Sequence, residues 1–433
     1  MLELEHQLSF DAEQAGEFFS GLPARAGVCL IEPRSAGAEP FLLRTQDLRR
    51  RLTKLLGLLE AQSKRLNLRE FAGRVRYRVT GSRFEQTLTY YQNAKLLHPS
   101  RYRDLMRIRP PAVLKVSLKN AYPRCFVTRR IPTNPLGVPI AGAYYGPFKK
   151  RKVAERFAEG VLDLFKVRRC QIKIRRDPTF PGCLYSEMKM CLAPCFAGCS
   201  QEEYGAEVQR LVQFLDTGGE SLRVALEKER EAASEDLDFE RASVLHKRVE
   251  KLDEALRGGP ELARRVTDLN AVILQRGAEE QTVGVYAVRG GYIAEPLLMR
   301  FAEIASAPKS AEQMFREYLE SPAPPPNDPA LRNELSEHLW LLARWYYGKE
   351  REGEIFFRDE LGRQAGWPYR RILRACSRLL APEPVVPAQS KPEPAAVVEV
   401  AGPASDARDA RVATKPGVAQ GNLFEKPSGE GAT

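Results

Sequence analysis

Long apolar runs are missing from this sequence, and so is a secretion signal. No run approaches the ~18–20 apolar residues that are needed to cross a bilayer. The N-terminus carries Glu3 and Glu5 and lacks the basic and then apolar segments of a signal peptide. We therefore expect a cytoplasmic protein with no membrane-spanning segment.

The length and composition are those of an ordinary globular protein. The 433 residues are 43% hydrophobic and 28% charged, which excludes a fibrous or wholly disordered chain. At roughly 100–200 residues per domain, the chain has room for about two to four domains.

Cysteine is scarce except in one segment, residues 170–199. Five of the eight cysteines lie there: Cys170, Cys183, Cys191, Cys195 and Cys199. Without an export signal, a metal site is favoured over disulfides. The first four supply enough thiolates for a [4Fe–4S] cluster or for zinc, and their spacing is looser than the paired C-x2-C of most zinc sites. Cys199 is a spare thiol or a substitute ligand, and buried apolar cysteines are the alternative to any metal.

Charge is uneven along the chain. Residues 101–180 hold 20 Lys and Arg against 5 Asp and Glu (net +15), and residues 201–240 hold 4 against 12 (net −8). Tyr90, Tyr91, Tyr102, Tyr144, Tyr145 and Phe148 lie among or beside the basic residues. Cations interleaved with aromatic rings are typical of nucleic-acid binding, and a solvated charged face is the alternative. The expected DNA contacts are Lys149, Lys150, Arg151, Arg168 and Arg169.

Hydropathy patterns predict an α+β, multidomain protein. Strands are expected at residues 27–31, within 112–130, and at 272–274, 283–288 and 292–301. Helices are expected at 46–66, at 151–167, over 201–256 with a break near 217–219, around Trp340 and Trp345, and at 368–380. Within 201–256 we expect two helices folded as an antiparallel hairpin. From residue 382 onward the composition predicts a disordered tail.

Two motifs resemble the UvrC family of bacterial excinucleases. One combines Tyr145-Gly146-Pro147-Phe148, Arg168-Arg169-Cys170, Cys183 and Cys191-Leu192-Ala193-Pro194-Cys195. The other, Ala232-Ala233-Ser234-Glu235-Asp236-Leu237-Asp238-Phe239-Glu240-Arg241-Ala242, resembles the family's UVR motif. The resemblance runs from about Leu22 to Phe301. It implies that Cys170, Cys183, Cys191 and Cys195 bind a [4Fe–4S] cluster. It also implies that the hairpin docks the excinuclease component UvrB through Leu237, Phe239 and Glu240.

The nuclease sites of that family are expected to be lost. Its N-terminal GIY-YIG domain needs two tyrosines, an arginine and a metal-binding glutamate. Arg51 matches the arginine, but Cys29 and Phe41 stand in place of the tyrosines and Tyr90 in place of the glutamate. A thiol or a phenyl ring lacks the phenolic oxygen, and without a carboxylate Mg²⁺ loses its protein ligand. Mg²⁺ is thus expected only if a rearranged site, with Glu85, is active. The family's second, ribonuclease-H-like nuclease is not expected after Phe301.

The predicted tail contains a short motif, Gln420-Gly421-Asn422-Leu423-Phe424. It resembles the peptide Gln-x-x-Leu-Phe by which bacterial repair proteins dock on the DNA polymerase sliding clamp. Gln420, Leu423 and Phe424 are therefore expected partner contacts.

Five segments follow from these expectations. They are a degenerate GIY-YIG-like domain (1–105), a basic cysteine module (106–200), the UVR hairpin (201–257), a strand region with helices (265–381) and the tail (382–433). The expected function is a non-catalytic, DNA-binding scaffold linked to nucleotide excision repair. The alternatives are an active UvrC-type endonuclease that incises damaged DNA and an iron–sulfur redox-sensing regulator.

Overall fold

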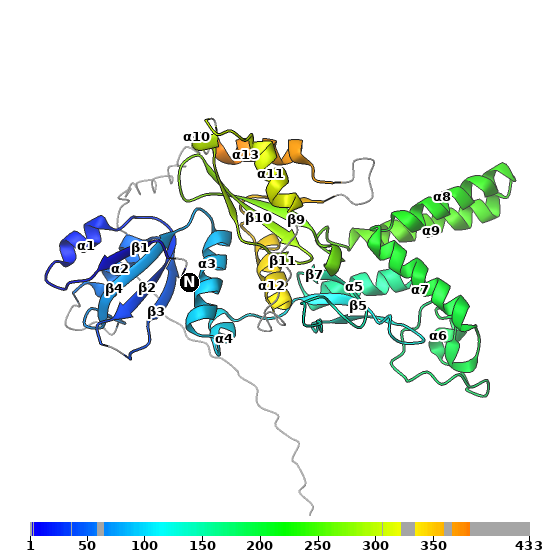
Figure 1. Ribbon diagram of the computed structural model, residues 1–433. Helices are drawn as coiled ribbons and strands as arrows, with labels where there is room; N and C mark the ends of the chain where they lie inside the picture. The colour runs from blue at the N-terminus through cyan, green and yellow to red at the C-terminus, as the bar shows by residue number, and fades with distance from the viewer. Residues whose placement is uncertain are drawn as a thin grey trace, which may run out of the picture. The chain divides into compact units, whose positions relative to one another are not determined.

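The protein is an α+β protein, as its hydropathy patterns predict. The computed structural model describes residue 2 and residues 4–35, 37–58, 65–304, 306–321, 334–358 and 366–381 (Figure 1). The described part contains three antiparallel sheets. No helix among these residues is long and apolar enough to span a membrane.

The first sheet has the strand order β1-β4-β2-β3. Its strands are β1 (His6–Ser9), β2 (Gly27–Pro33), β3 (Phe41–Thr45) and β4 (Ala72–Val79). Helices α1 (Ala15–Gly21) and α2 (Leu48–Leu56) cover one face, and α3 (Arg83–Leu97) and α4 (Tyr102–Met106) lie against the other.

Two predicted elements of this sheet region are found, one of them shortened. The strand predicted at 27–31 is β2, and the helix predicted at 46–66 is α2. Helix α2 begins where Asp47 accepts a hydrogen bond from the backbone N–H of Arg50 (2.8 Å) and ends before Gly57. Residues 59–64 lie outside the described part.

The second sheet has the order β6-β5-β7-β8. Its strands are β5 (Ala112–Val116), β6 (Cys125–Thr128), β7 (Ala143–Phe148) and β8 (Arg264–Arg265). Helices α5 (Arg151–Leu162) and α7 (Gln201–Asp216) share its hydrophobic core, where Phe157 and Phe214 are buried. The long connection between them carries the short helix α6 (Leu184–Glu187) and the 3-10 helix η1 (Pro194–Phe196). The strands predicted within 112–130 are confirmed, and the helix predicted over 151–167 is found but ends at Leu162.

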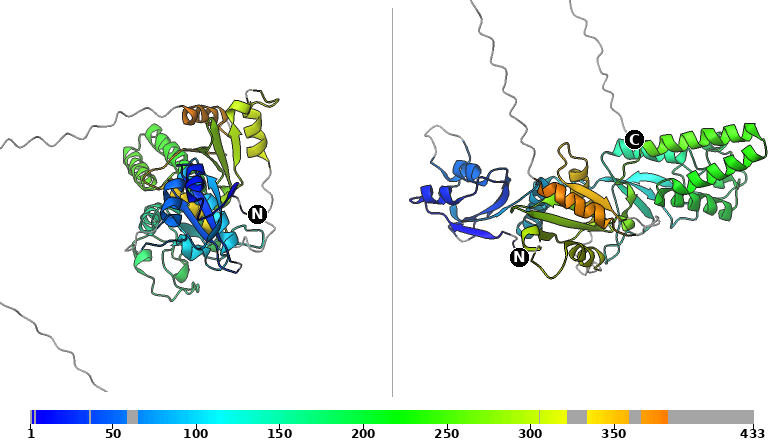
Figure 2. Two further views of the ribbon diagram at one scale, coloured as in Figure 1. Left: turned by 90° about the vertical axis from the view of Figure 1, so that its left-hand side faces the viewer. Right: turned by 90° about the horizontal axis from the view of Figure 1, so that it is seen from above.

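The predicted hairpin is formed by α8 (Glu220–Glu235) and α9 (Phe239–Arg257). The two helices lie side by side in Figure 1 and in the right-hand view of Figure 2. The segment 201–256 has two breaks, at 217–219 and at 236–238, where the pattern predicted one. Helix α7 therefore belongs to the core of the second sheet, and only α8 and α9 form the hairpin.

The third sheet has the order β11-β10-β9-β13, and β12 also pairs with β10. Its strands are β9 (Ala271–Arg276), β10 (Thr282–Arg289), β11 (Tyr292–Ile293), β12 (Leu297–Arg300) and β13 (Glu354–Phe357). Helices α11 (Ala311–Glu320) and α13 (Tyr369–Leu380) pack on one face, and α12 (Glu334–Tyr346) packs on the other. The predicted strands and helices of this region are confirmed, except that the strand expected over 292–301 is divided into β11 and β12, and Phe301 begins the helix α10 (Phe301–Ile304).

A buried carboxylate joins α12 to α3 and α4. Glu337 is 3% exposed and accepts hydrogen bonds from the hydroxyls of Tyr91 (2.6 Å) and Tyr102 (2.9 Å). It also pairs with Arg103 Nε at 2.6 Å. Because a buried charge is stable only when it is paired and hydrogen-bonded, this network fixes the third sheet's helix against the first sheet's helix.

Candidate nucleic-acid interface and cysteine site

The basic run that follows β7 lies at the start of helix α5. Lys149, Lys150 and Arg151 are all exposed there, and so is Lys152. Arg151 pairs with Glu155 at 2.6 Å, and within the described residues no ion pair is found for the three lysines. The free N–H groups at a helix N-terminus attract anions, and cations at the same place add to that attraction. Lys152 was not among the expected contacts, although it continues the run of basic residues.

Arg168 is held inside the protein. It is 7% exposed. Its side chain donates to the carbonyls of Tyr122 (2.9 Å), Ile172 (3.0 Å) and Cys170 (3.3 Å). A guanidinium that is buried and bonded in this way is not available to a phosphate, so Arg168 holds the cysteine loop instead of contacting DNA.

Arg169 is also engaged within the chain. Its side chain is 15% exposed and pairs with Asp163 at 2.6 Å. Of the five expected DNA contacts, the structure therefore leaves Lys149, Lys150 and Arg151 open to a ligand.

The aromatic residues of the basic region belong to the core, and the expectation that they face nucleic acid is wrong for most of them. Tyr144, Tyr145 and Phe148 are at most 1% exposed. The Tyr145 hydroxyl donates to Asp216 (2.8 Å), which also pairs with Arg265. The aromatic pattern arose because β7 is buried on both faces, which favours large side chains at consecutive positions.

The four predicted metal ligands share one loop region after α5. Cys183 is the N-cap residue of α6, and Cys195 lies in η1. The pKa of the Cys191 thiol is raised to about 11, chiefly by burial; the Ala193 N–H opposes the shift, and the nearby thiols of Cys170, Cys195 and Cys183 add to it. Cys191 is thus within electrostatic reach of the other three thiols.

Hydrogen-bond donors point at these sulfur atoms. The Ala193 N–H donates to Cys191 Sγ (3.3 Å), and Arg168 Nη1 lies 3.9 Å from Cys170 Sγ. Within the described ranges, no group of three or more His, Cys, Asp or Glu side chains is placed to hold a metal ion. The cysteines and the two donors lie in one loop region, but among the described residues the thiols are not arranged around a single ion.

Cys199 has a different environment. It is 6% exposed and packs in the core of the second sheet with Tyr204 and Val208. Burial raises the pKa of its thiol, and the neighbouring carboxylate of Glu203 raises it further. Cys199 thus behaves as an apolar core residue.

The structure does not bring Tyr90 to the other three nuclease positions, Cys29, Phe41 and Arg51. Cys29 on β2 and Phe41 on β3 pack toward α1 and α2, and Arg51 is exposed on α2. Burial raises the pKa of the Cys29 thiol to about 12, which leaves it protonated and inert, although the Arg51 charge opposes this shift. Tyr90 lies on the other face of the sheet, on α3, with the Arg44 guanidinium 5.6 Å from its ring centre.

Glu85, the carboxylate expected in a rearranged nuclease site, is hydrogen-bonded within the turn that precedes α3. It is 5% exposed and accepts a hydrogen bond from the Gly81 N–H (2.7 Å). Burial raises its pKa, while the Gly81 N–H and the charge of Arg78 oppose the shift. Its role is to fix the turn that precedes α3.

The expected partner residues lie at the tip of the α8–α9 hairpin. Leu237 and Phe239 are 71% and 69% exposed, and Glu240 is exposed beside them. The packing between the two helices is supplied elsewhere, by Leu226, Ala233, Leu245 and Val249. The tip is thus an apolar surface that the hairpin's own fold does not use. Gln420, Leu423 and Phe424 lie outside the described residues.

Comparisons with known proteins find a family match for the middle of the chain. Residues 112–214 match the family described as UvrC/Cho excinuclease, middle domain. This range includes the second sheet's first three strands, the basic run and all four predicted cluster cysteines. No solved structure matches the chain.

Relatives named UvrABC system protein C match longer parts of the chain. The one from Nitratidesulfovibrio vulgaris is 30% identical over 204 residues, which are 47% of this chain and 27% of that protein. The one from Acetivibrio thermocellus is 23% identical over 239 residues (54% and 37%), and the one from Desulforudis audaxviator is 28% identical over 282 residues (64% and 44%). The chain therefore spans less than half the length of each of these relatives. The middle of the chain is thus similar to the UvrC/Cho middle domain, and these relatives extend the similarity to UvrC proteins beyond it.

Proposed function

We propose that this chain is a DNA-binding scaffold of nucleotide excision repair that does not cut DNA. The observation that carries the proposal is the separation of the degenerate nuclease positions, with Cys29 buried on one face of the first sheet and Tyr90 on the other. Neither side chain can hold a metal-bound water near the other, and Glu85 is already bonded to Gly81.

The DNA contact is assigned to the start of α5. Lys149, Lys150, Arg151 and Lys152 are exposed around the free N–H groups of this 12-residue helix. Such a site takes backbone phosphates and reads no base sequence. Binding is therefore expected to be sequence-tolerant and to weaken steeply with salt.

The experiment measures binding of a labelled duplex over a range of salt concentrations. Replacing Lys149, Lys150 and Arg151 by alanine is expected to lower the slope of log K against log salt by about 2.7, since each phosphate contact contributes about 0.9. The matched control replaces Lys247, Arg248 and Lys251, exposed cations on α9, by alanine and is expected to leave the slope unchanged. Equal slopes for both variants would remove α5 from the interface.

The same samples test for catalysis. Incision of a lesion-bearing duplex is measured with Mg²⁺ or Mn²⁺, with and without the excinuclease components UvrA and UvrB. Nicking by the parent protein that disappears in Arg51→Ala would overturn the scaffold proposal in favour of an endonuclease. Binding without nicking supports it.

We also propose that Cys170, Cys183, Cys191 and Cys195 hold a [4Fe–4S] cluster. In such a cluster each thiolate binds a different iron atom, so the thiolates surround a larger object than the single ion of a zinc site. The placement of the four cysteines in one loop region and the N–H donor to Cys191 Sγ support the proposal. The cluster would cross-link a loop that has little regular structure of its own, in the connection that follows α5. Iron and acid-labile sulfide in the anaerobically purified protein support the assignment, and zinc alone refutes it.

The hairpin tip is the proposed docking site for a UvrB-like partner. Exposed apolar side chains ringed by acidic residues fit a partner surface with an apolar pocket and a basic rim. Docking of the sliding clamp on Gln420, Leu423 and Phe424 remains a prediction from the sequence. A redox-sensing role would require that oxidation of the cluster changes the affinity for DNA.

A further inference from the structure

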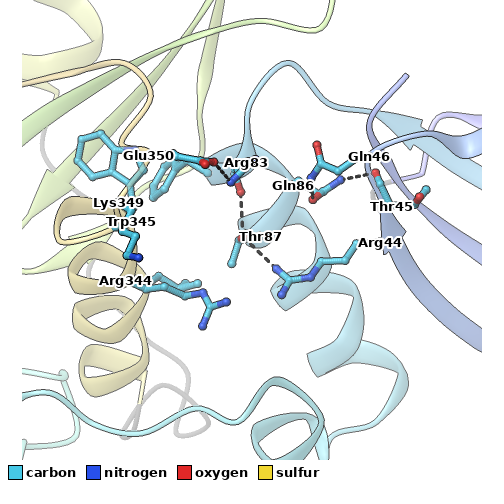
Figure 3. Close-up of a pocket in the computed structure, with 13 residues that line it drawn as sticks. Arg44, Thr45, Gln46, Arg83, Gln86, Thr87, Arg344, Trp345, Lys349 and Glu350 are labelled. Carbon is cyan, nitrogen blue, oxygen red and sulfur yellow. Dashed lines mark hydrogen bonds and ion pairs between the residues drawn. The ribbon is translucent and has the colours of Figure 1, made fainter. Parts of the chain in front are cut away.

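A second cationic site lies between α3 and α12, at the end of β3. The cavity has a volume of about 740 Å³. Figure 3 shows Arg44 from β3 and Arg344 from α12 pointing into it from opposite walls. The other lining residues that matter here are Arg83 and Thr87 of α3 and Lys349, which follows α12.

The two opposed guanidiniums are supported but not neutralised. Arg44 Nη1 donates to Thr87 Oγ1 (3.1 Å), and the Arg44 guanidinium lies 5.6 Å from the Tyr90 ring centre. The Arg344 guanidinium lies 5.4 Å from the Trp340 ring centre. Across the described residues, neither arginine has a carboxylate within ion-pair distance.

Like charges therefore face each other across the cavity. Desolvation lowers the pKa of Arg44, and the positive charge of Arg344 lowers it further. Lys349 adds a third exposed cation with no ion pair in the described part of the chain. Only Arg83 is compensated, because Glu350 and Glu352 pair with it. An anion placed between Arg44 and Arg344 would turn their repulsion into two attractive contacts.

The side chains that line the cavity favour a phosphate group as the ligand. The planar guanidiniums offer paired N–H donors that match phosphate oxygens. The aromatic side chains of the cavity, Phe84 and Trp345, are 3% and 8% exposed. The Trp345 Nε1–H is already donated to the Glu352 carbonyl (3.0 Å), and the Gln86 amide N–H groups to the carbonyls of Thr45 and Gly27. These lining groups leave no buried donor to read a base, so contacts to a nucleic-acid backbone fit better than capture of one particular nucleotide.

We propose that this cavity binds the phosphate groups of a single nucleic-acid strand without a metal ion. The inference rests on the proposed DNA-binding function and adds a second contact region to it. At this site Tyr90 stands where the sequence resemblance puts a metal-binding glutamate. Its ring supports Arg44, and the cations Arg44 and Arg344 supply the positive charge. Glu350, the carboxylate among the lining residues, is paired with Arg83.

The test is binding of a fluorescein-labelled oligothymidylate to the full chain in EDTA, followed by fluorescence anisotropy. The variant Arg44→Gln with Arg344→Gln is expected to bind about tenfold or more weakly at low salt. Its slope of log K against log salt is expected to fall by about 1.4, because each contact to a single strand contributes about 0.7. Arg44→Lys with Arg344→Lys keeps both charges and is expected to keep most of that slope.

The matched control is Arg50→Gln with Arg370→Gln, which removes the same charge from exposed arginines that do not line the cavity. It is expected to bind like the parent, and thermal unfolding establishes that all variants are folded. Equal binding by the control and the cavity variant overturns the cavity assignment alone. Failure of the parent to bind any oligonucleotide overturns both this inference and the proposed function. Thymidine 5′-phosphate that competes as strongly as the oligonucleotide makes the cavity a nucleotide site and overturns the assignment to a strand.

Discussion

Substitutions at the tip of the α8–α9 hairpin can test docking without lowering the folding stability, and Phe239 is the most informative position. Phe239 is 69% exposed. An aromatic side chain buries roughly 200 Å², so covering that fraction at about 25 cal/mol per Å² is worth about 3 kcal/mol to a complex. Phe239→Ala is therefore expected to weaken binding of UvrB about a hundredfold. The free energy of unfolding should stay within about 0.5 kcal/mol of the parent, because the side chain contacts solvent.

A substitution at Leu237 is expected to weaken docking without lowering the stability of the hairpin. It adopts a left-handed backbone conformation with φ of 56° in the turn between the helices, which glycine adopts without strain. Leu237→Gly is thus expected to leave the hairpin as stable as before or more stable, and to weaken docking. Leu245→Ala is the contrasting control. Its side chain is 4% exposed and packs between α8 and α9, so the change should cost about 2–5 kcal/mol of stability.

The assay is isothermal titration of UvrB with the parent and the three variants, accompanied by urea unfolding of each. Docking through the tip requires that Phe239→Ala and Leu237→Gly lose affinity while they keep their unfolding midpoints. Unchanged affinity in both would refute the docking role of the tip. A loss of affinity in Leu245→Ala alone would mean that docking depends on the hairpin's fold and not on its tip.

Three further predictions concern stability and the cysteine loop. Glu337→Ala leaves the buried Tyr91 hydroxyl without its acceptor and removes the ion-pair partner of the half-exposed Arg103, so urea unfolding should show a loss of about 1–3 kcal/mol; an unchanged free energy of unfolding contradicts the network. Burial lowers the pKa of His338 to about 4 from its ordinary value of 6.5. The unfolded chain therefore takes up a proton first, and about 3 kcal/mol of stability present above pH 6.5 is lost as the pH falls to 4; His338→Gln should flatten this part of the stability curve, and an unchanged curve refutes the assignment. Cys195→Ser is expected to reduce the iron content sharply while Cys199→Ser leaves it unchanged, as measured by iron analysis of the purified protein, and the reverse result would make Cys199 a ligand.

Local patterns in the sequence predicted most elements of the fold. Alternating and helical hydropathy located β2, β9 and β10, and the helices α12 and α13, because each depends on which residues of a short segment are apolar. The break at 236–238 was missed, since Leu237 is apolar and its left-handed conformation is not encoded by hydropathy.

The sequence by itself also determined the chemistry that is available: four closely spaced cysteines, a run of cations before α5, and missing tyrosine and glutamate side chains at the nuclease positions. Tertiary structure decided which of these groups a ligand can reach. It buried Arg168 and Tyr145 and exposed Phe239. It also brought Arg44 and Arg344, which are 300 positions apart in the sequence, to one cavity. The physical reason is that residue type fixes what a side chain can do, whereas burial and pairing depend on long-range packing against other elements.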